Sequence, residues 1–366
     1  MTQQGRGVGV IRAGTALAAA ALAGCATVER APSADRPPAF VDAHAETEPV
    51  RGSGDAADDP AVWVHPTDPG RSLVFGSDKK RGVATYDLAG RELAFDEVGP
   101  INNIDLRRGV RVGGEASDLL AGSRRSDDHI QLFRIDPAAP GLRPAGAFPT
   151  DLDGVYGVAM HRDPATGAAE VLVNTKPGEV RRYRITRLGT GVAADARARL
   201  VDGWSVGGPT EGMVVDDATG SLFLGEETGG VWLYRLRGEE TARRLVARVR
   251  PDAPWLTADV EGLALVPAPG GEHRLIASSQ GSDRFVVYRA ELDRPEPVVR
   301  PIGWFRVRLG DDEVSGTDGI GATTRPVPGY PGGLLVVQDD ENPGANQNFK
   351  LVPLGPALDA AGAGDG

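Results

Sequence analysis

The 366-residue sequence has little of what several protein classes need. Its single cysteine, Cys25, excludes a disulfide framework. Its net charge of -11, with no basic stripe, argues against a nucleic-acid partner, because Lys and Arg must neutralise the phosphates. The five histidines show no zinc spacing, and there is no Gly-x-Ser-x-Gly elbow, Walker-type loop or cysteine nucleophile. Helical periodicity is nearly absent, so the core must be built from strands.

Long apolar runs are also lacking. The run 13–24 is too short to span a bilayer, but it follows Arg6 and Arg12 and suits a signal peptide. It ends in Leu22-Ala23-Gly24-Cys25, which resembles the bacterial lipoprotein cleavage box. We therefore expect a signal peptide at 1–24, a lipidated Cys25 and a flexible tether over 25–44. An ordinary secretory signal, or a chance cysteine, is the alternative.

These features predict an exported protein. No aspartate follows Cys25, which in a lipoprotein of Gram-negative bacteria indicates the outer membrane; a periplasmic or secreted protein is the alternative. The lipid anchor is the only membrane attachment that we expect, and we expect the protein to be a monomer.

What the sequence does contain is Gly and Pro, 50 and 28 residues, and a phrase that recurs six times before an apolar strand. The copies are Asp59-Pro60-Ala61-Val62, Asn103-Ile104-Asp105-Leu106, Tyr156-Gly157-Val158, Glu211-Gly212-Met213, Glu261-Gly262-Leu263 and Asp318-Gly319-Ile320. Their first residues are spaced by 44, 53, 55, 50 and 57 residues. Such a period indicates a repeated structural unit, whose equivalent residues meet in space.

Each repeat divides into four short strands bounded by Gly, Asp and Pro. In the fourth repeat, the expected strands are 212–215, 221–225, 230–235 and 244–249. Repeated four-stranded units of this length predict an all-β, six-bladed β-propeller of antiparallel blades over 45–355, followed by a disordered tail at 356–366. The last repeat lacks an outer strand, so we expect residues 45–52 to supply it and close the ring.

The opening residues and the ends of the second strands converge on one face of such a propeller. Lys79, Arg125 and Lys176 lie there and suit an oxyanion such as phosphate. Facing them is an acidic set: Asp58, Asp59, Glu211, Glu227, Asp259 and Glu261. Crowded carboxylates repel one another unless they are protonated or bridged by metal, and loop-borne oxygen ligands favour calcium. The pattern predicts phosphoryl-ester hydrolysis with calcium between protein acids and substrate phosphates.

Less specific interpretations exist. An acid followed by Gly at a strand start can be a turn preference, and Tyr156 alone could be a packing residue. A propeller lactonase, another calcium hydrolase or a non-catalytic calcium-binding propeller would share the acids, although a lactonase would not need three phosphate-holding cations.

The sequence resembles the β-propeller phytases, which are calcium-dependent phytate hydrolases of bacteria, over roughly 46–354. The resemblance rests on ordered phrases: 46–50 (ETEPV), 54–63 (GDAADDPAVW), 102–107 (NNIDLR), 155–157 (VYG), 210–213 (TEGM), 220–227 (GSLFLGEE), 256–263 (LTADVEGL) and 345–353 (ANQNFKLVP).

The resemblance implies stepwise release of phosphate from calcium-phytate by attack of calcium-activated water, with one phosphate pocket for cleavage and one for affinity. By position, it implies a calcium-binding and water-activating group of Asp58, Tyr156, Glu211, Glu227, Asp259 and Glu261. It implies that Lys79, Arg125 and Lys176 hold phosphate. Further calcium ions stabilise the fold in this family, and the candidates here are Asp318, Asp339, Asn346 and Asn348. The loop 339–344 is shorter than is typical, so we expect lower or less calcium-dependent heat tolerance.

Overall fold

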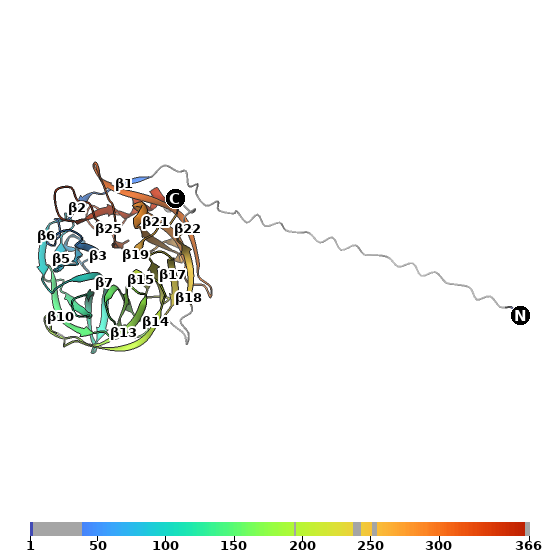
Figure 1. Cartoon of the computed structure of the whole chain (residues 1–366), viewed down its shortest axis with the longest axis horizontal. Coiled ribbons are helices and arrows are strands. Elements are labelled where there is room, and N and C mark those ends of the chain that lie inside the picture. The colour runs from blue at the N-terminus through green and yellow to red at the C-terminus, as the bar shows by residue number, and fades with distance from the viewer. Residues whose placement is uncertain (3–38, 194, 237–242, 251–254, 363–366) are drawn as a thin grey trace. The chain divides into compact units, whose positions relative to one another are not determined.

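Six four-stranded antiparallel units form a ring in a computed structural model, which describes residues 1–2, 39–193, 195–236, 243–250 and 255–362 (Figure 1). This confirms the six-bladed β-propeller that the repeats predict. In each blade, the strands follow one another outward from the central channel because tight turns join antiparallel neighbours. The signal peptide, Cys25 and residues 25–38 of the tether lie outside the described residues.

The first three blades each take four consecutive strands. Blade one contains β3 (Ala57–Trp63), β4 (Leu73–Asp78), β5 (Gly82–Tyr86) and β6 (Glu92–Asp96). Blade two contains β7 (Ile101–Val112), β8 (Glu115–Arg124), β9 (His129–Ile135) and β10 (Leu142–Pro149). Blade three contains β11 (Val155–Arg162), β12 (Ala169–Thr175), β13 (Glu179–Arg187) and β14 (Arg197–Ser205).

Blades four and five continue the pattern. Blade four contains β15 (Thr210–Asp216), β16 (Ser221–Glu226), β17 (Gly230–Arg235) and β18 (Arg243–Arg248), close to the predicted boundaries. Blade five contains β19 (Val260–Pro267), β20 (His273–Ser279), β21 (Arg284–Glu291) and β22 (Val298–Leu309), with β23 (Asp312–Glu313) paired to β22. Three single-turn helices, η1 (Pro69–Arg71), η2 (Pro269–Gly271) and η3 (Gln280–Ser282), lie in the connections.

Blade six combines both ends of the described chain. Its inner strands are β24 (Ile320–Thr323), β25 (Leu334–Asp339) and β26 (Asn348–Pro353), and its outer strand is β2 (Ala45–Glu46), antiparallel to β26. The N-terminal segment thus lies where the missing outer strand was expected, although only two of residues 45–52 pair as a strand.

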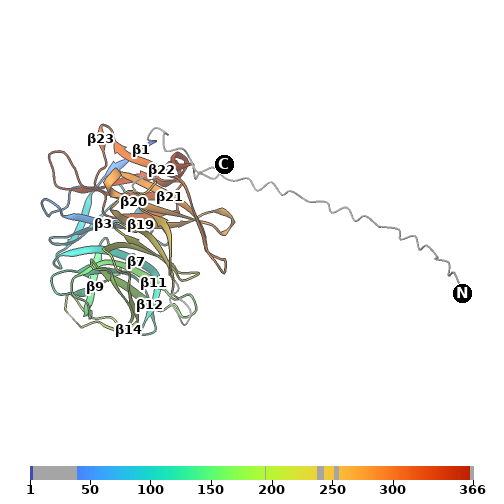
Figure 2. The ribbon, with the colours of Figure 1, turned by 45° about the vertical axis from the view of Figure 1, so that its right-hand side comes forward.

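Two predicted boundaries differ from the structure. Residues 40–42, which were assigned to the tether, form β1 (Phe40–Asp42), parallel to β22 of blade five (Figure 2). Residues 356–361, which were assigned to a disordered tail, belong to α1 (Leu354–Ala361). Helix α1 buries Leu354, Ala357 and Ala361 against blades five and six. Neither segment has a strong sequence pattern of its own. Each is ordered by apolar or backbone contacts with strands that are distant in sequence, so the sequence alone did not reveal it.

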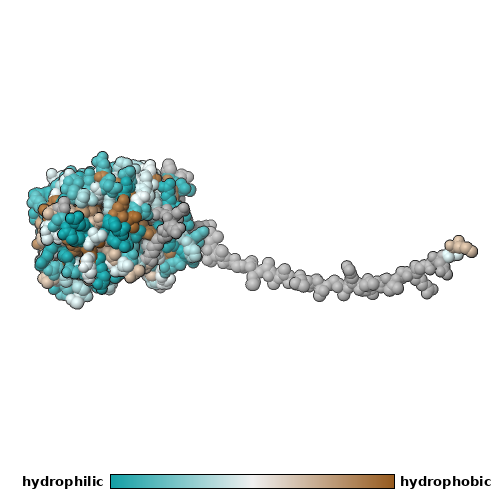
Figure 3. All heavy atoms as spheres, turned by 90° about the horizontal axis from the view of Figure 1, so that it is seen from below, coloured by the Kyte–Doolittle hydropathy of each residue, from teal (hydrophilic) through white to brown (hydrophobic). Residues whose placement is uncertain are grey.

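The core consists of apolar layers between neighbouring blades. Between blades five and six, for example, Ile276, Phe305 and Leu335 are fully buried in one cluster. The visible face in Figure 3 is mainly hydrophilic, with small hydrophobic areas scattered over it. No helix in the described part of the chain is long and apolar enough to cross a membrane.

Candidate functional site

The site lies where the inner strands begin. In each of the first five inner strands, the pairing with the second strand is interrupted by a β-bulge at the opening phrase. The interrupted segments are 57–60, 101–104, 155–158, 210–213 and 260–263. A bulge bends the strand and redirects its side chains, so these irregularities turn the opening side chains toward one another. The sequence phrases mark their positions but do not predict the bulges.

Polar side chains on the second strands stabilise these openings. A bulge leaves backbone N–H groups without a ladder partner, and buried N–H groups require one. The donor and acceptor pairs are Asp59 N to Ser77 Oγ at 2.9 Å, Asn103 N to Ser123 Oγ at 3.1 Å, Gly157 N to Asn174 Oδ1 at 2.8 Å and, before β24, Asp318 N to Gln338 Oε1 at 2.8 Å. The backbone at the openings of blades one, two, three and six is therefore fixed by hydrogen bonds to the second strand of the same blade.

The glycine of the repeated phrase has a packing role. A side chain at Gly157 would overlap the carbonyl oxygen of Glu211, and one at Gly212 would overlap that of Glu261. A Cβ atom at Gly319 would lie 2.5 Å from the carbonyl oxygen of Asp58. These glycines let neighbouring inner strands approach closely, so a simple turn preference does not account for the phrase.

Three glutamates meet at the centre of the acidic group. One carboxylate oxygen of each of Glu211, Glu227 and Glu261 lies within 4.8 Å of the others, and all three residues are buried. Burial, together with the negative charge of Glu261, raises the pKa of Glu211 well above its ordinary value. Burial likewise raises the pKa of Glu261 to about 8. Close, buried carboxylates of this kind favour a bridging cation.

Several acidic oxygens of the central site have no hydrogen bond within the described residues, although a lysine Nζ atom lies 3.4 Å from two of them. They are both carboxylate oxygens of Asp58, Oε1 of Glu227 and Oε2 of Glu261. Asp58 is 1% exposed, and burial, with the charge of Glu211, raises its pKa well above the ordinary value. Leaving charged oxygens buried and without donors is costly. Their chemistry fits a hard divalent cation such as calcium, which takes six to eight oxygen ligands.

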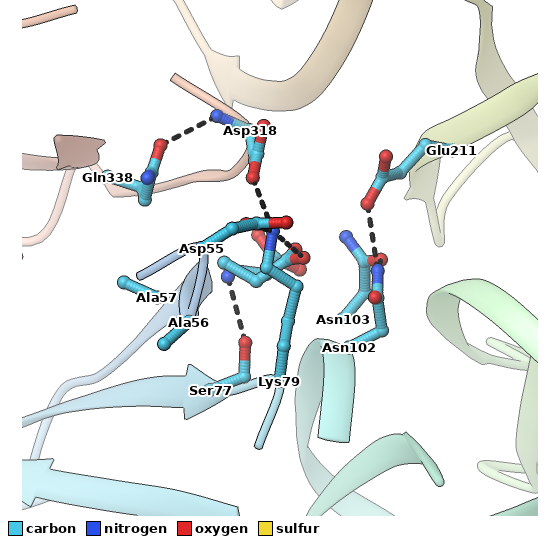
Figure 4. A network of polar contacts seen from close by, with 12 residues as sticks. Asp55, Ala56, Ala57, Ser77, Lys79, Asn102, Asn103, Glu211, Asp318 and Gln338 are labelled. Carbon is cyan, nitrogen blue, oxygen red and sulfur yellow. Dashed lines mark hydrogen bonds and ion pairs between the residues drawn. The ribbon is translucent and has the colours of Figure 1, made fainter. Parts of the chain in front are cut away.

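Lys79 lies inside the acidic group, not opposite it. Its Nζ atom is 2.7 Å from Asp318 Oδ2 and 3.4 Å from Asp58 Oδ2, and it also contacts Asp55 (Figure 4). Burial alone would lower the pKa of Lys79, but the charges of Asp58 and Asp318 raise it. The expected division into an acidic side and a basic side of three cations is therefore wrong for Lys79.

The other two cations lie around Tyr156. The guanidinium carbon of Arg125 and Nζ of Lys176 lie 5.5 Å and 5.3 Å from the centre of the Tyr156 ring. Lys176 is 60% exposed in its side chain and lies 3.4 Å from Glu227 Oε1. Burial, with the charge of Glu211, raises the pKa of the Tyr156 hydroxyl. Tyr156 thus lies between the acids and these two cations.

Asp259 lies outside the group of three glutamates. It is half-buried, directly before β19, and its backbone oxygen accepts a hydrogen bond from Gln280 N at 3.0 Å. Its sequence neighbour Glu261 belongs to that group, so adjacency in sequence does not place both carboxylates at the same point.

Two of the four residues predicted to bind stabilising calcium, Asp339 and Asn348, are paired across β25 and β26, whereas Asp318 and Asn346 make other contacts. Asp318 belongs to the central site, where Gln280 Nε2 also donates to it at 2.7 Å. Asn346 donates through Nδ2 to the backbone oxygen of Val50 at 3.0 Å. Asn348 donates through Nδ2 to Glu46 Oε2 at 2.9 Å.

A protein cation lies next to Asp339. The Nζ atom of Lys350, which is fully buried, is 3.1 Å from Asp339, 2.9 Å from Asp312 and 2.5 Å from Glu46. Burial raises the pKa of Asp339 to about 6. A single lysine ammonium thus pairs with three carboxylates, one of which is the Asp339 that the sequence assigned to calcium.

Asn102 and Asp55 were missed as site residues. Both lie in phrases that carry the family resemblance, but their role depends on contacts with residues far away in sequence. Asn102 Nδ2 donates to Glu211 Oε1 at 2.8 Å, and Asp55 pairs with Lys79. Beyond the bulges, the channel encloses a cavity of about 340 Å³ lined by the inner strands, including Asp59, Asp105 and Arg107.

Comparisons with known proteins agree with this geometry. The family model described as "Phytase" matches residues 11–363. A 3-phytase of Bacillus subtilis (strain 168) is 36% identical over 326 residues, which cover 85% of this chain and 83% of the relative. With the propeller and its acidic, cation-flanked site, these matches show that the chain belongs to the phytase family.

Proposed function

We propose that this enzyme releases phosphate stepwise from calcium-phytate, with calcium held by the buried acids of the central site. The observation that supports it most is the set of buried carboxylate oxygens that make no hydrogen bond within the described residues, with Lys176 and Arg125 nearby around Tyr156. The 36% identity to a 3-phytase supports phytate as the substrate.

The residues fit calcium. Asp58, Glu211, Glu227 and Glu261 are acceptor-only groups when ionised, and their pairing with calcium would offset their mutual repulsion. Bound calcium would supply positive charge between protein acids and substrate phosphates and would lower the pKa of nearby water. Asp318 joins this set, because it contacts Lys79 beside Asp58. Asp259, which lies outside the group of three glutamates, remains a candidate calcium ligand.

The protein's cations have separable roles. Lys176, which is largely exposed, and Arg125 lie where they can bind a substrate phosphate, and the Tyr156 ring limits their movement. Lys79 pairs with three carboxylates, and it would be available to phosphate once other positive charge neutralised those carboxylates. Stabilising calcium at Asp339, Asn346 and Asn348 has less support, because Lys350 already pairs with Asp339.

The test is phosphate release from phytate, measured with calcium, with a calcium chelator, and after calcium is restored in excess. We expect release only in the first and third conditions, and magnesium in place of calcium serves as the control for general divalent charge. Full activity in chelator would contradict the calcium role. Absence of release in all conditions would contradict the substrate and leave a lactonase or a binding protein to be tested.

We further propose export and attachment to the outer membrane through a lipidated Cys25. The support is the sequence around Cys25, which lies outside the described residues. Cys25→Ser should move the protein from the membrane fraction to the soluble fraction without changing phosphate release by the purified enzyme. A wild-type protein that is already soluble would favour the ordinary secretory signal.

A further inference from the structure

One buried amide joins an acid of the central site to a cation beside it. Asn102 is 0% exposed and lies in the bulge of β7. Its Nδ2 atom donates to Glu211 Oε1 at 2.8 Å and to Asn103 Oδ1 at 2.8 Å, and its Oδ1 atom accepts from Arg125 Nη1 at 2.9 Å. Figure 4 shows the contact between Asn102 and Glu211.

The chemistry of these partners allows only one orientation of the amide. A carboxylate needs a donor and a guanidinium needs an acceptor, so the NH₂ group must face Glu211 and the oxygen must face Arg125. Neither aspartate nor leucine could satisfy both partners. Because buried polar groups without partners are costly, each of the three side chains restrains the other two.

We propose that Asn102 is a positioning residue for phosphate release, which sets the separation between Glu211 on the acidic side and Arg125 on the phosphate-binding side. The inference rests on the roles proposed for those two residues. Asn102 itself needs no contact with substrate. It acts by holding the Glu211 carboxylate and the Arg125 guanidinium at a fixed separation. A misplacement of about 1 Å at such a site costs roughly a hundredfold in rate.

A double-mutant cycle on phytate hydrolysis tests this role. Asn102→Ala should lower kcat/KM by about tenfold to a hundredfold. In the wild-type background, Arg125→Ala should lower kcat/KM by about tenfold or more, whereas in the Asn102→Ala background it should cost less than about threefold. The fold losses in kcat/KM from Lys176→Ala and Asn102→Ala should multiply in the double variant, because the described structure gives these two residues no contact.

Gln131 supplies a matched control for the loss of a buried amide. It is also 0% exposed, accepts from Arg124 Nη1 at 2.9 Å and donates to the backbone oxygen of Gly146 at 3.1 Å, outside the central site. Gln131→Ala should lower the melting temperature as Asn102→Ala does, yet leave kcat and KM unchanged. If Asn102→Ala fails to fold, Asn102→Asp, which has the same size but repels Glu211, replaces it in the cycle.

The outcomes separate the inference from the proposed function. If Arg125→Ala and Glu211→Gln both leave hydrolysis unchanged, the roles proposed for these residues are wrong and the role of Asn102 is wrong with them. If they lower hydrolysis but Asn102→Ala does not, or if its effect multiplies fully with that of Arg125→Ala, the positioning role of Asn102 alone is overturned.

Discussion

Single carboxylates in this protein have roles that their neighbours decide. Glu211 and Glu226 both lie at strand ends near the central face, yet Glu211 is buried among acids while Glu226 accepts a hydrogen bond from Trp232 Nε1 at 2.7 Å. The raised pKa of Glu211 reflects burial and repulsion. The hydrogen bond from Trp232 gives Glu226 a structural role.

Glu211→Gln should lower kcat for phytate at least about a hundredfold, the usual scale for losing an acid or base at a reacting centre. The metal-free variant should melt no lower than the wild type, because the amide removes the repulsion with Glu261. Steady-state kinetics and calorimetry in chelator measure the two effects, with Glu226→Gln as a control of equal charge change. Near-normal turnover would exclude Glu211 from the chemistry.

Lys176→Ala should raise KM for phytate about tenfold and change kcat little, because a largely exposed cation contributes affinity for a phosphate that is not cleaved. The exposed neighbour of Lys79 in sequence, Lys80, is the matched control, and Lys80→Ala should change neither constant. A loss confined to kcat would instead place Lys176 at the cleaved phosphate.

Within an element, the strand pattern was predictable and the irregularities were not. Alternating apolar residues and turn residues predicted the four strands of each blade. The bulges at the opening phrases depend on pairing between two strands, which a single strand's pattern does not contain. Other buried polar networks lie away from the central site. The one in blade three joins Glu170 to His161, Arg182 and Arg184.

Glu170→Gln should destabilise blade three. Burial alone would raise the pKa of Glu170, but its hydrogen bond with His161 and the charge of Arg182 lower it from 4.5 to about 2. The unfolded chain therefore takes up a proton at higher pH than the folded chain. The stabilisation is complete above about pH 4.5 and is lost as the pH falls toward about 2.

Denaturant unfolding between pH 7 and pH 2.5 measures this effect. At neutral pH, the variant should lose about 3 kcal/mol, because it leaves buried arginine charge unpaired. The difference from wild type should shrink at the acidic end. Glu179→Gln, at an exposed position on β13, should change little at any pH. A difference that does not depend on pH would contradict the ion-pair explanation.

At the scale of the whole molecule, the N-terminal segment connects blades five and six. Strand β1 pairs with β22, β2 pairs with β26, and Glu46 binds the buried Lys350. A ring whose last blade takes its outer strand from the other end of the chain has no free edge there. We predict that this pairing closes the ring.

Two truncations test the closure. A chain that begins at residue 39 keeps both strands and should melt with the full-length protein. A chain that begins at residue 47 loses β1, β2 and Glu46, and its melting temperature should fall on the order of 5 °C. Differential scanning calorimetry of the two purified proteins measures this, and equal melting temperatures would refute the closure.

The sequence by itself determined the repeat, the number of blades, the approximate strands of the fourth blade and the residues that open each blade, because these follow from local hydrophobic pattern and turn chemistry. Only the tertiary structure decided which charges meet. It placed Lys79 among acids, beside Asp318, and set Lys350 beside Asp339. It also ordered β1 and α1 against distant strands. The physical reason is that ion pairing, desolvation and edge pairing depend on which blades are neighbours and where side chains point, and neither is encoded in a single repeat.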